Sequence, residues 1–270
     1  MIRFDNVTFS YEPGKSAVSH VSLSVERGRI LAVAGPNGSG KSTLALLADG
    51  LLLADSGGVS VDGLDPASDA DLWTVRQRVG VVFQNPDDQI VGALVEEDTA
   101  FGPENLGVPQ DELAHRVADA LSAVGLSGLE RREPHLLSEG QKQRLAVAGA
   151  LAMDPAYMVF DEPTALLDPV GRRMFAGIVT RSAREDGRGV MLVTHRPSEI
   201  ALADRVIVLG AGSILWEGHP ATLLADPGLM ASVGLAPSQL GRVVASLRAA
   251  GRDVPSTAQD PSAVVAALWR

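Results

Sequence analysis

Apolar residues occur along this chain in two kinds of pattern, short continuous runs and stripes with a spacing of three to four. Continuous runs are typical of parallel strands that are covered on both faces. They occupy residues 30–34, 79–83, 157–160 and 189–194. Residues 1 to about 25 instead alternate apolar and polar positions on each side of a Pro13-Gly14 turn, which predicts two further strands. The pattern as a whole predicts an α/β fold with a parallel core sheet.

The stripes predict helices between these strands. The segment from about 111 to 124 has an apolar face, with Asp111 as its expected cap and Gly125 as its stop. That face comprises Leu113, Val117, Leu121 and Val124. A second helix of small residues is expected at 145–153, after the N-cap residue Ser138. Residues from about 85 to 135 therefore form a helix-rich insertion between strands.

Two further features follow the last buried run. A hairpin is expected where residues 205–209 and 213–216 flank Gly210-Ala211-Gly212. After about Pro227 the composition shifts to Ala, Ser, Pro and Arg, and two amphipathic helices are expected around a 251–261 linker. Their apolar positions are Leu240, Val243, Val244 and Leu247 in the first, and Val264, Val265, Leu268 and Trp269 in the second. These stripes either pack on their own domain or form a dimer contact.

Composition narrows the class of protein. The 270 residues are 46% hydrophobic and 21% charged, which is typical of a globular protein with a large core. A net charge of −10 argues against nucleic acid as the main partner. The absence of cysteine excludes disulfides and thiolate metal sites. No basic segment followed by an apolar one opens the chain, and no apolar run reaches about 18 residues, so we expect no targeting peptide and no membrane span.

The segment from Gly35 to Thr43 has the spacing G-x-x-x-x-G-K-[ST] of a phosphate-binding loop. An apolar, strand-like run precedes it and a helix-prone segment follows it, which is the setting that this motif requires. Its glycines allow successive N–H groups to point into one concavity at the start of a helix. Lys41 is expected to bind β- and γ-phosphate oxygens, and the Ser42 hydroxyl to ligate Mg²⁺. The sequence therefore predicts a nucleotide site.

Polar residues stand at the ends of three other buried runs. They are Gln84, Asp161 with Glu162, and His195. In open α/β sheets ligands bind beyond the carboxyl ends of the strands, so these groups should converge on the phosphate loop. Asp161 suits a metal ligand, Glu162 a general base for water, and His195 a group that bonds the γ-phosphate and orients Glu162. Gln84 is expected to reach both metal and water. Each alone could be a cap or a hydrogen-bonded core residue.

Taken in order, these residues resemble the ATP-binding-cassette (ABC) ATPase family over residues 1 to about 225. The matching segments are Walker A at 35–43, the Q-loop at 84, the signature at 137–141, Walker B at 158–162, the D-loop at 165–168 and the switch histidine at 195. The resemblance implies an ATPase with a P-loop NTPase domain over residues 1–227. That domain combines the parallel core sheet with an antiparallel β subdomain and a helical subdomain at about 85–150. A helical extension over residues 228–270 completes the chain.

The resemblance also assigns the site residues. ATP and Mg²⁺ are the implied cofactors. The implied nucleotide-binding residues are Tyr11, Gly35, Pro36, Asn37, Gly38, Ser39, Gly40, Lys41, Ser42, Thr43, Ser138, Gly140 and Gln141. Tyr11 occupies the position of the ring that stacks on adenine. Ser42, Gln84 and Asp161 are the implied metal ligands, and Glu162, His195 and Gln84 the implied catalytic residues. Ser138 and Gly140 are expected to complete the site of an opposite subunit.

Within the family, residues 83–89 and 95–107 are similar to the energy-coupling-factor importers, including the cobalt-transport ATPases. This implies a homo- or heterodimeric ATPase pair on the cytoplasmic face of the cell membrane, peripheral to it. The pair would bind a transmembrane coupling protein and a substrate-binding membrane protein, and import a vitamin or a cobalt- or nickel-like ion. The groove after Gln84 is expected to be acidic and to take basic groups of the coupling protein. Its expected acidic residues are Asp87, Asp88, Glu96 and Glu97.

One residue departs from the family pattern. Glu139 stands where the signature usually has its first glycine, between Ser138 and Gly140. A carboxylate near a polyanion repels it unless the side chain points away. Glu139 is therefore either a tolerated outward-facing variant or the mark of a weaker signature in a heterodimer.

Two other functions compete with import. A soluble ABC ATPase acting on DNA or ribosomes would need a coiled-coil insertion or a second cassette, and a P-loop kinase would need a lid over its acceptor. The sequence has neither a coiled-coil insertion nor a second cassette, and it has a signature motif where a kinase would need the lid.

Overall fold

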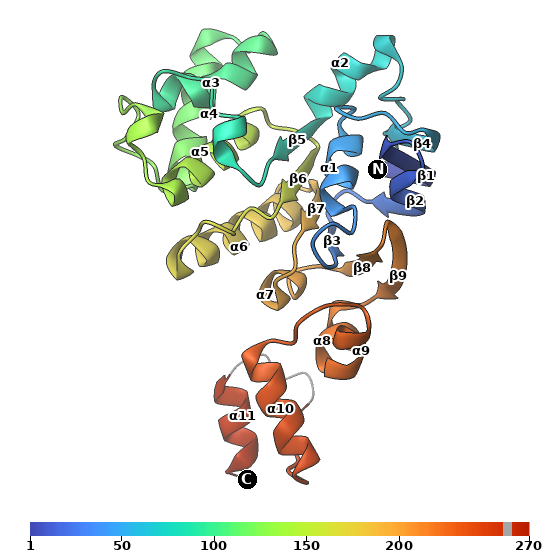
Figure 1. The fold of residues 1–270 in the computed structure, drawn as a ribbon. Helices are drawn as coiled ribbons and strands as arrows, with labels where there is room; N and C mark the ends of the chain where they lie inside the picture. The colour runs from blue at the N-terminus through green and yellow to red at the C-terminus, as the bar shows by residue number, and fades with distance from the viewer. Residues whose placement is uncertain (256–260, 270) are drawn as a thin grey trace.

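The computed structural model describes residues 1–255 and 261–269, and a six-stranded sheet forms its centre (Figure 1). The strand order is β5-β6-β7-β3-β8-β9. The strands are β3 (Ile30–Ala34), β5 (Val79–Val82), β6 (Tyr157–Asp161), β7 (Gly189–Val193), β8 (Arg205–Gly210) and β9 (Ser213–Gly218). The first five run parallel, and β9 pairs antiparallel with β8 through the expected hairpin.

Alternate residues of the central strands face two different cores, as the pleat of a sheet requires. Ala32, Phe160 and Leu192 belong to the core that α5 (Glu139–Ala152) and α6 (Pro169–Arg184) cover. Val33, Val159 and Val193 point to the opposite face, onto α1 (Lys41–Ala48) and the second sheet. Because both faces are covered, the strands are apolar at every position. This confirms the prediction that the continuous apolar runs are strands covered on both faces.

The second sheet is antiparallel and has the order β2-β1-β4. It consists of β1 (Ile2–Glu12), β2 (Lys15–Val25) and β4 (Ser56–Val61). The Pro13-Gly14 turn joins the first two strands, as expected, and Gly14 takes a φ of 83° that a glycine accepts at no steric cost. The turn places Tyr11 at the edge of this sheet that faces α1.

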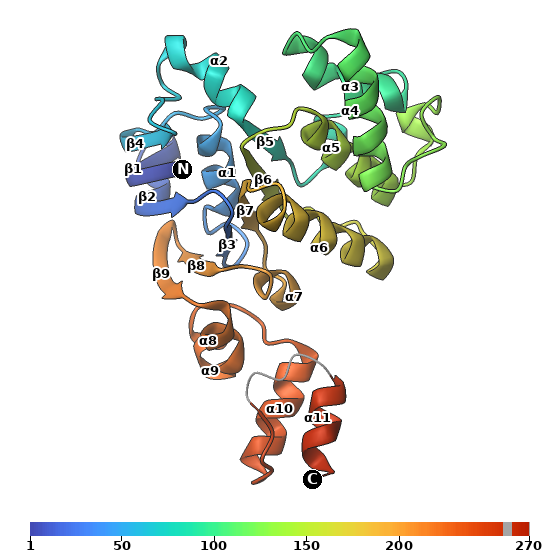
Figure 2. The same ribbon diagram turned by 180° about the vertical axis from the view of Figure 1, so that it is seen from behind.

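The helices of the insertion lie together at one side of the sheet in both views (Figure 2). They are η1 (Pro86–Asp88), α3 (Val95–Asn105), α4 (Gln110–Ala123), η2 (Pro134–Leu136) and α5. Helix α4 begins at Gln110 with Pro109 as its N-cap, so the expected cap at Asp111 was wrong; Asp111 lies in the first turn, where its charge favours the helix dipole. Ser138 caps α5 as expected, but that helix begins at Glu139, six residues before the predicted start at 145.

Further helices connect the remaining elements. Helix α2 (Asp69–Arg78) precedes β5, α6 precedes β7, and α7 (Pro197–Ile200) follows it. Helices α8 (Pro220–Ala225) and α9 (Pro227–Ser232) follow the hairpin. Met230, Val233 and Leu235 belong to the same core as α5 and α6. The boundary expected at residues 227–228 stays a prediction, and this packing favours a position nearer Leu235.

Helices α10 (Gln239–Ala249) and α11 (Pro261–Leu268) lie side by side, apart from the sheets, at the C-terminal end of the molecule (Figures 1 and 2). Val244, Val254 and Val264 form a small core of their own, against which Leu240 and Leu247 pack. Val243, Val265, Leu268 and Trp269 of the expected stripes are exposed. Residues 256–260 of the expected linker lie outside the described residues.

Candidate functional site

Four polar segments follow four adjacent parallel strands. The phosphate loop follows β3 and His195 follows β7. Asp161 is the last residue of β6, Glu162 comes directly after it, and Gln84 lies two residues after β5. Because β5, β6, β7 and β3 are neighbours and parallel, the loops after them lie at one edge of the sheet. The predicted convergence of these segments is confirmed at the level of topology.

The phosphate loop has a backbone that only glycine accommodates at two positions. Gly35 and Gly40 have φ values of 144° and 99°. A Cβ at Gly35 would lie 2.3 Å from the carbonyl oxygen of Leu209, and one at Gly40 would lie 2.2 Å from that of Ala17. The loop is therefore held between the β8 end and the β2 strand, with Asn37 exposed and Ser39 buried. Backbone amides at the start of a helix such as α1 are suited to binding an anion.

Lys41 lies at the first position of α1 and is buried. Its Nζ donates hydrogen bonds to the carbonyl oxygens of Gly35 at 3.0 Å and Pro36 at 2.8 Å. Burial lowers the pKa of Lys41, and the carboxylates of Glu162 and Asp161 act in the opposite direction. The ammonium group is thus held inside the loop, close enough for electrostatic attraction to the carboxylates of Glu162 and Asp161.

Asp161 is buried beside Ser42 at the end of β6. Burial raises the pKa of its carboxyl group, while the hydrogen bond from the Ser42 side chain and the charge of Lys41 lower it. Its Oδ1 atom is buried and has no hydrogen-bond partner within residues 1–255 or 261–269. A hydroxyl oxygen next to a carboxylate with a spare oxygen fits a Mg²⁺ ion, which prefers oxygen ligands.

Glu162 and His195 form a direct pair. The Nδ1 atom of His195 lies 3.1 Å from Oε1 of Glu162. The side chain of Glu162 is 13% exposed and that of His195 is 47% exposed. Glu162 has a φ of 46°, which is uncommon for a residue with a side chain, and its N–H donates to the carbonyl oxygen of Val193 at 3.0 Å. The carboxylate is therefore fixed beside the strand that delivers His195.

A cavity of about 360 Å³ opens between the phosphate loop and the β1–β2 turn. Tyr11 lines it with an exposed ring, whose hydroxyl lies 3.3 Å from the Thr43 hydroxyl and whose edge packs on Phe9. Glu12, Lys15 and Ser16 also line the cavity, and the sequence reading did not single them out. The sequence could have indicated Glu12, Lys15 and Ser16 only through their position beside Tyr11 and the Pro13-Gly14 turn.

Gln84 and the signature residues lie outside this cavity. The side chain of Gln84 is exposed. Ser138 and Gln141 bond each other at the start of α5, where the Ser138 hydroxyl accepts from Gln141 N–H and Gln141 Oε1 accepts from Ser138 N–H. Ser138, Gly140 and Gln141 therefore do not line the cavity beside the phosphate loop, and neither do Asp161, Glu162 and His195.

The Glu139 carboxylate forms an ion pair with Lys142. Lys142 Nζ lies 3.1 Å from Glu139 Oε1 and 2.9 Å from Asp87 Oδ1. Both carboxylates raise the pKa of Lys142. The ammonium group therefore links the signature to η1, the segment just after Gln84, and offsets the charge of Glu139.

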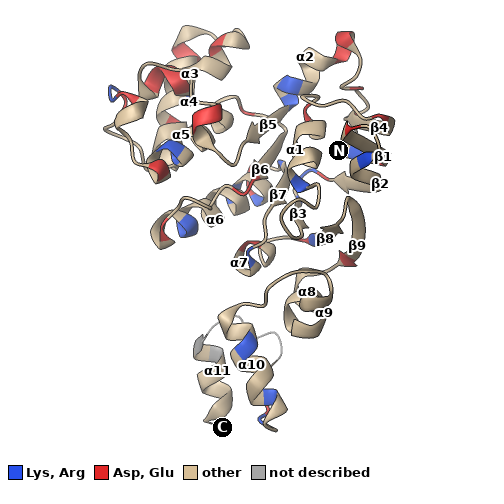
Figure 3. Ribbon diagram, viewed as in Figure 1, with Lys and Arg blue, Asp and Glu red and all other residues tan. Residues whose placement is uncertain are grey.

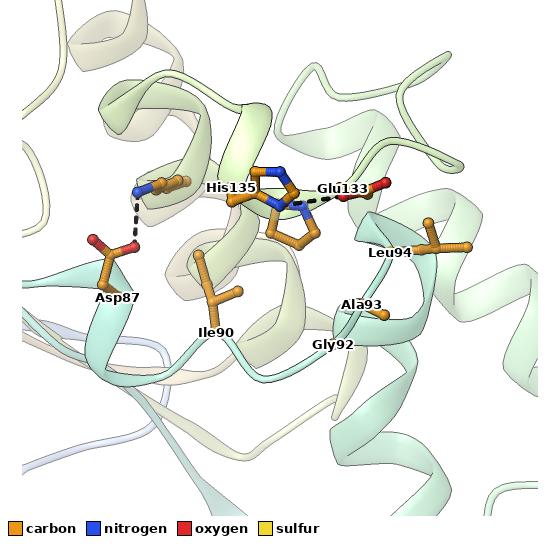
Figure 4. A pocket seen from close by; sticks show the side chains of 9 residues that line it. Asp87, Ile90, Gly92, Ala93, Leu94, Glu133 and His135 are labelled. Carbon is orange, nitrogen blue, oxygen red and sulfur yellow. Dashed lines mark ion pairs between the residues drawn. The ribbon is translucent and has the colours of Figure 1, made fainter.

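Asp87 and Lys142 line a second cavity, of about 520 Å³, which we call the η1 groove (Figure 4). Its other lining residues are Ile90, Gly92, Ala93, Leu94, Glu133, Pro134 and His135. Of the four acidic residues expected there, only Asp87 lines the groove. Glu96 pairs with Arg131 and Glu97 accepts from Leu94 N–H, so both carboxylates have partners nearby. Glu133, which the sequence reading missed, is the second carboxylate of the groove.

Comparisons with known proteins agree with this geometry. The family model described as ABC transporter matches residues 18–165. A protein of Symbiobacterium thermophilum named energy-coupling factor transporter ATP-binding protein EcfA1 is 50% identical over 256 residues, 95% of this chain and 89% of the relative. A protein of the same name from Caldanaerobacter subterraneus subsp. tengcongensis is 45% identical over 260 residues, 95% of this chain and 94% of the relative.

Solved structures show the same architecture. That of cbiO1 from Clostridium perfringens, described as part of the ABC transporter complex cbiONQ, has a TM-score of 0.77 and 32% identity, and the match covers 92% of this chain and 98% of that one. The dimeric bacterial ABC transporter cassette MJ0796 has a TM-score of 0.75 and 28% identity. The match covers 82% of this chain and 99% of that one. The fold class expected from the sequence is confirmed.

Proposed function

This chain belongs to the ABC transporter family and is an ATPase of that family, and we propose that it powers an energy-coupling-factor importer for a vitamin or a transition-metal ion such as cobalt or nickel. One observation carries the proposal. Relatives named as energy-coupling factor ATP-binding proteins match 95% of this chain at 45–50% identity, whereas the general family model matches only residues 18–165. The likeness is therefore not confined to the segments that all cassettes share.

In this proposal the phosphate loop and Tyr11 hold ATP. The amides of residues 35–43 and the Lys41 ammonium bind the phosphates, and the exposed Tyr11 ring stacks on the base. Ser42, Asp161 and Gln84 hold the Mg²⁺ ion, which supplies charge stabilisation at the phosphates when bound. The buried, unpartnered oxygen of Asp161 supports that assignment for Asp161.

Hydrolysis needs a base for water and a group that holds the base in place. Glu162 accepts the proton of the attacking water, and its partly buried carboxylate lies among the other charged groups of the site. His195 orients Glu162 through the 3.1 Å contact and uses its other ring nitrogen to bond the γ-phosphate. Gln84, on the exposed segment after β5, positions the water.

A second subunit completes each site. Ser138, Gly140 and Gln141 do not line the cavity beside the phosphate loop of their own chain, and in this proposal they bind the ATP held by an opposite subunit. The dimeric state named for the MJ0796 cassette supports the same arrangement. We propose a homo- or heterodimer that closes on two ATP molecules and reopens after hydrolysis.

The η1 groove is the proposed contact with a transmembrane coupling protein. Acidic residues gather on α3 and the neighbouring segments (Figure 3), and Asp87 and Glu133 line the groove itself. A basic helix of the partner suits these charges. No helix in the part of the chain that the structure describes is both long and apolar enough to cross a membrane. The proposed location is the cytoplasmic face of the membrane, peripheral to the coupling protein and a substrate-binding protein.

Co-purification tests the proposal directly. The tagged chain, recovered from detergent-solubilised membranes of its own host, should retain a polytopic membrane protein at fixed stoichiometry. A matched variant, Glu133→Arg, should lose that protein while keeping its ATPase activity, because Glu133 pairs with His135 rather than with Lys142. Retention of ribosomes or DNA instead would support a soluble ABC ATPase and contradict the importer.

A further inference from the structure

The segments that carry Glu162 and His195 are joined a second time, away from that pair. The Thr164 hydroxyl donates a hydrogen bond to Oε1 of Glu199. Thr164 lies two residues after Glu162, and Glu199 lies four residues after His195 in α7. Thr164 is 1% exposed and Glu199 is 6% exposed, so water does not compete for this bond.

Glu199 is a poorly compensated buried carboxylate. Its Oε2 atom is buried and, among the described residues, has no hydrogen-bond partner. Among the described residues it forms one ion pair, with the Arg196 guanidinium, whose Nε lies 3.8 Å from Oε1, too far for a hydrogen bond. Burying a carboxylate with one hydroxyl as its hydrogen-bond donor costs free energy relative to an apolar pair of similar volume.

The position of the bond suggests what it does. On the strand side, the two segments are fixed by the β6–β7 ladder, which ends with Glu162 N–H donating to Val193 at 3.0 Å. Beyond Glu162 the chain turns, with Ala165 N–H donating to the Glu162 carbonyl oxygen at 3.1 Å. The Thr164–Glu199 bond closes this loop against α7. It fixes the two backbones on the side that the ladder does not reach.

The direct contact between Glu162 and His195 does not hold the segments together by itself. His195 is 47% exposed, so water competes for that contact. Both side chains must be held within a fraction of an ångström to act together on a water molecule. The buried bond behind them is the rigid link.

We propose that Thr164 and Glu199 are positioning residues, which hold the Glu162–His195 pair in its reactive geometry through the Thr164–Glu199 hydrogen bond. This inference rests on the roles proposed above for Glu162 and His195. Thr164 and Glu199 touch neither nucleotide nor metal in this assignment.

Removal of the hydroxyl tests the link at almost constant volume. Thr164→Val should lower kcat by about tenfold to a hundredfold, the size expected when reacting groups shift by about an ångström. KM for ATP should stay within about twofold, since the phosphate loop and Tyr11 are untouched. Thr180→Val is the matched control, because the Thr180 hydroxyl donates to the Ala176 carbonyl oxygen within its own helix α6. It should leave kcat unchanged.

Conservative variants separate positioning from folding. Thr164→Ser keeps a hydroxyl, and Glu199→Gln keeps a carbonyl oxygen that accepts from it; both should recover kcat to within about threefold of the unmodified protein. Glu199→Met removes the acceptor and should behave like Thr164→Val. All are measured well below their melting temperatures. The proposal is contradicted if Thr164→Val is folded with unchanged kcat, or if kcat simply follows thermal stability across the set.

Combination with Glu162→Gln distinguishes this inference from the proposed function. If Glu162 is the base, Thr164→Val should reduce the residual turnover of Glu162→Gln by less than about twofold, because a positioning residue has nothing left to position. Full turnover in Glu162→Gln would overturn the role of Glu162. A large loss in Glu162→Gln with a fully additive effect of Thr164→Val would overturn only the positioning role.

Discussion

The Nδ1 atom of His195 lies 3.1 Å from Oε1 of Glu162, although 33 residues separate them in sequence. The register of two neighbouring parallel strands brings them together, with Asp161 opposite Val193. The pair therefore follows from the topology of the sheet, and its chemistry is open to direct tests.

His195→Ala should lower kcat by about a hundredfold, within the range of a lost acid–base or orienting group. ATP should still bind, because the phosphate loop with Lys41 and the Tyr11 ring are unchanged and only the proposed γ-phosphate contact of His195 is lost. Steady-state hydrolysis and equilibrium binding of a fluorescent ATP analogue measure the two effects separately. His115→Ala, on the exposed surface of α4, is the matched control. Equal losses in the two variants would contradict the assignment.

Tyr11→Ala should raise KM for ATP by about tenfold, since stacking on an aromatic ring stabilises a bound base by about 1–3 kcal/mol. GTP should show the same rise, because every base has a face to stack. Tyr11→Trp should retain or improve affinity. A KM that does not respond to removal of the ring would show that the base lies elsewhere.

Lys142→Met should lower ATPase activity by about two- to fivefold, the size expected of an exposed ion pair. Without the ammonium group at 3.1 Å, the Glu139 carboxylate faces the polyphosphate uncompensated. Adding Glu139→Gly should restore activity, and Glu139→Gly alone should change it by less than about twofold. A marked rise in Glu139→Gly alone would instead support a signature weakened by its carboxylate.

Asp49 predicts a pH dependence of stability. Burial at the end of α1 raises the pKa of its carboxyl group from 3.8 to about 6, while Leu51 N–H and Arg76 lower it. Between these two values the folded state binds the proton more tightly, so the free energy of unfolding falls as pH rises from about 4 to 6 and stays lower above it. The penalty at neutral pH is on the order of 1–3 kcal/mol.

Asp49→Asn should therefore raise the melting temperature at pH 7.5 by several degrees and leave it nearly unchanged at pH 4. The amide keeps an oxygen for the bond from Leu51 N–H. Thermal denaturation at the two pH values, beside the exposed Asp119→Asn, measures the difference. Equal shifts at both pH values would show that charge burial is not the cause.

The strands and their polar ends could be predicted from the sequence because local chemistry specifies them. Residues such as Phe160 and Leu192 lie in runs that are apolar at every position, and Asp161 and His195 follow directly. The order of these runs along the chain was enough to place the candidate site at one edge of the sheet.

Helix α3 was missed for a physical reason. It contains Gly102 and Pro103, and its apolar positions do not form a clear stripe. The helix is fixed instead by Asp98, whose Oδ1 accepts from the N–H groups of Val91 and Gly92 at 2.7 Å and 2.9 Å. These hydrogen bonds depend on how the loop that contains Val91 and Gly92 folds against the helix. The spacing of residues in the sequence does not predict that fold.

The links between distant segments were equally hidden. Lys142 is 55 residues from Asp87, and Glu199 is 35 residues from Thr164. Each residue alone reads as an ordinary charged or polar side chain. Only the packing of α5 against η1, and of α7 beside the end of β6, makes them partners.

Substitution of Glu162 by Gln tests the central claim most directly, because it removes the proposed base while keeping the shape of the side chain. The purified variant should bind ATP with Mg²⁺ at the affinity of the unmodified protein and remain an ATP-loaded dimer, yet release phosphate at less than about 1% of the normal rate. Phosphate release at the normal rate would contradict the assignment of Glu162 and the mechanism built on it.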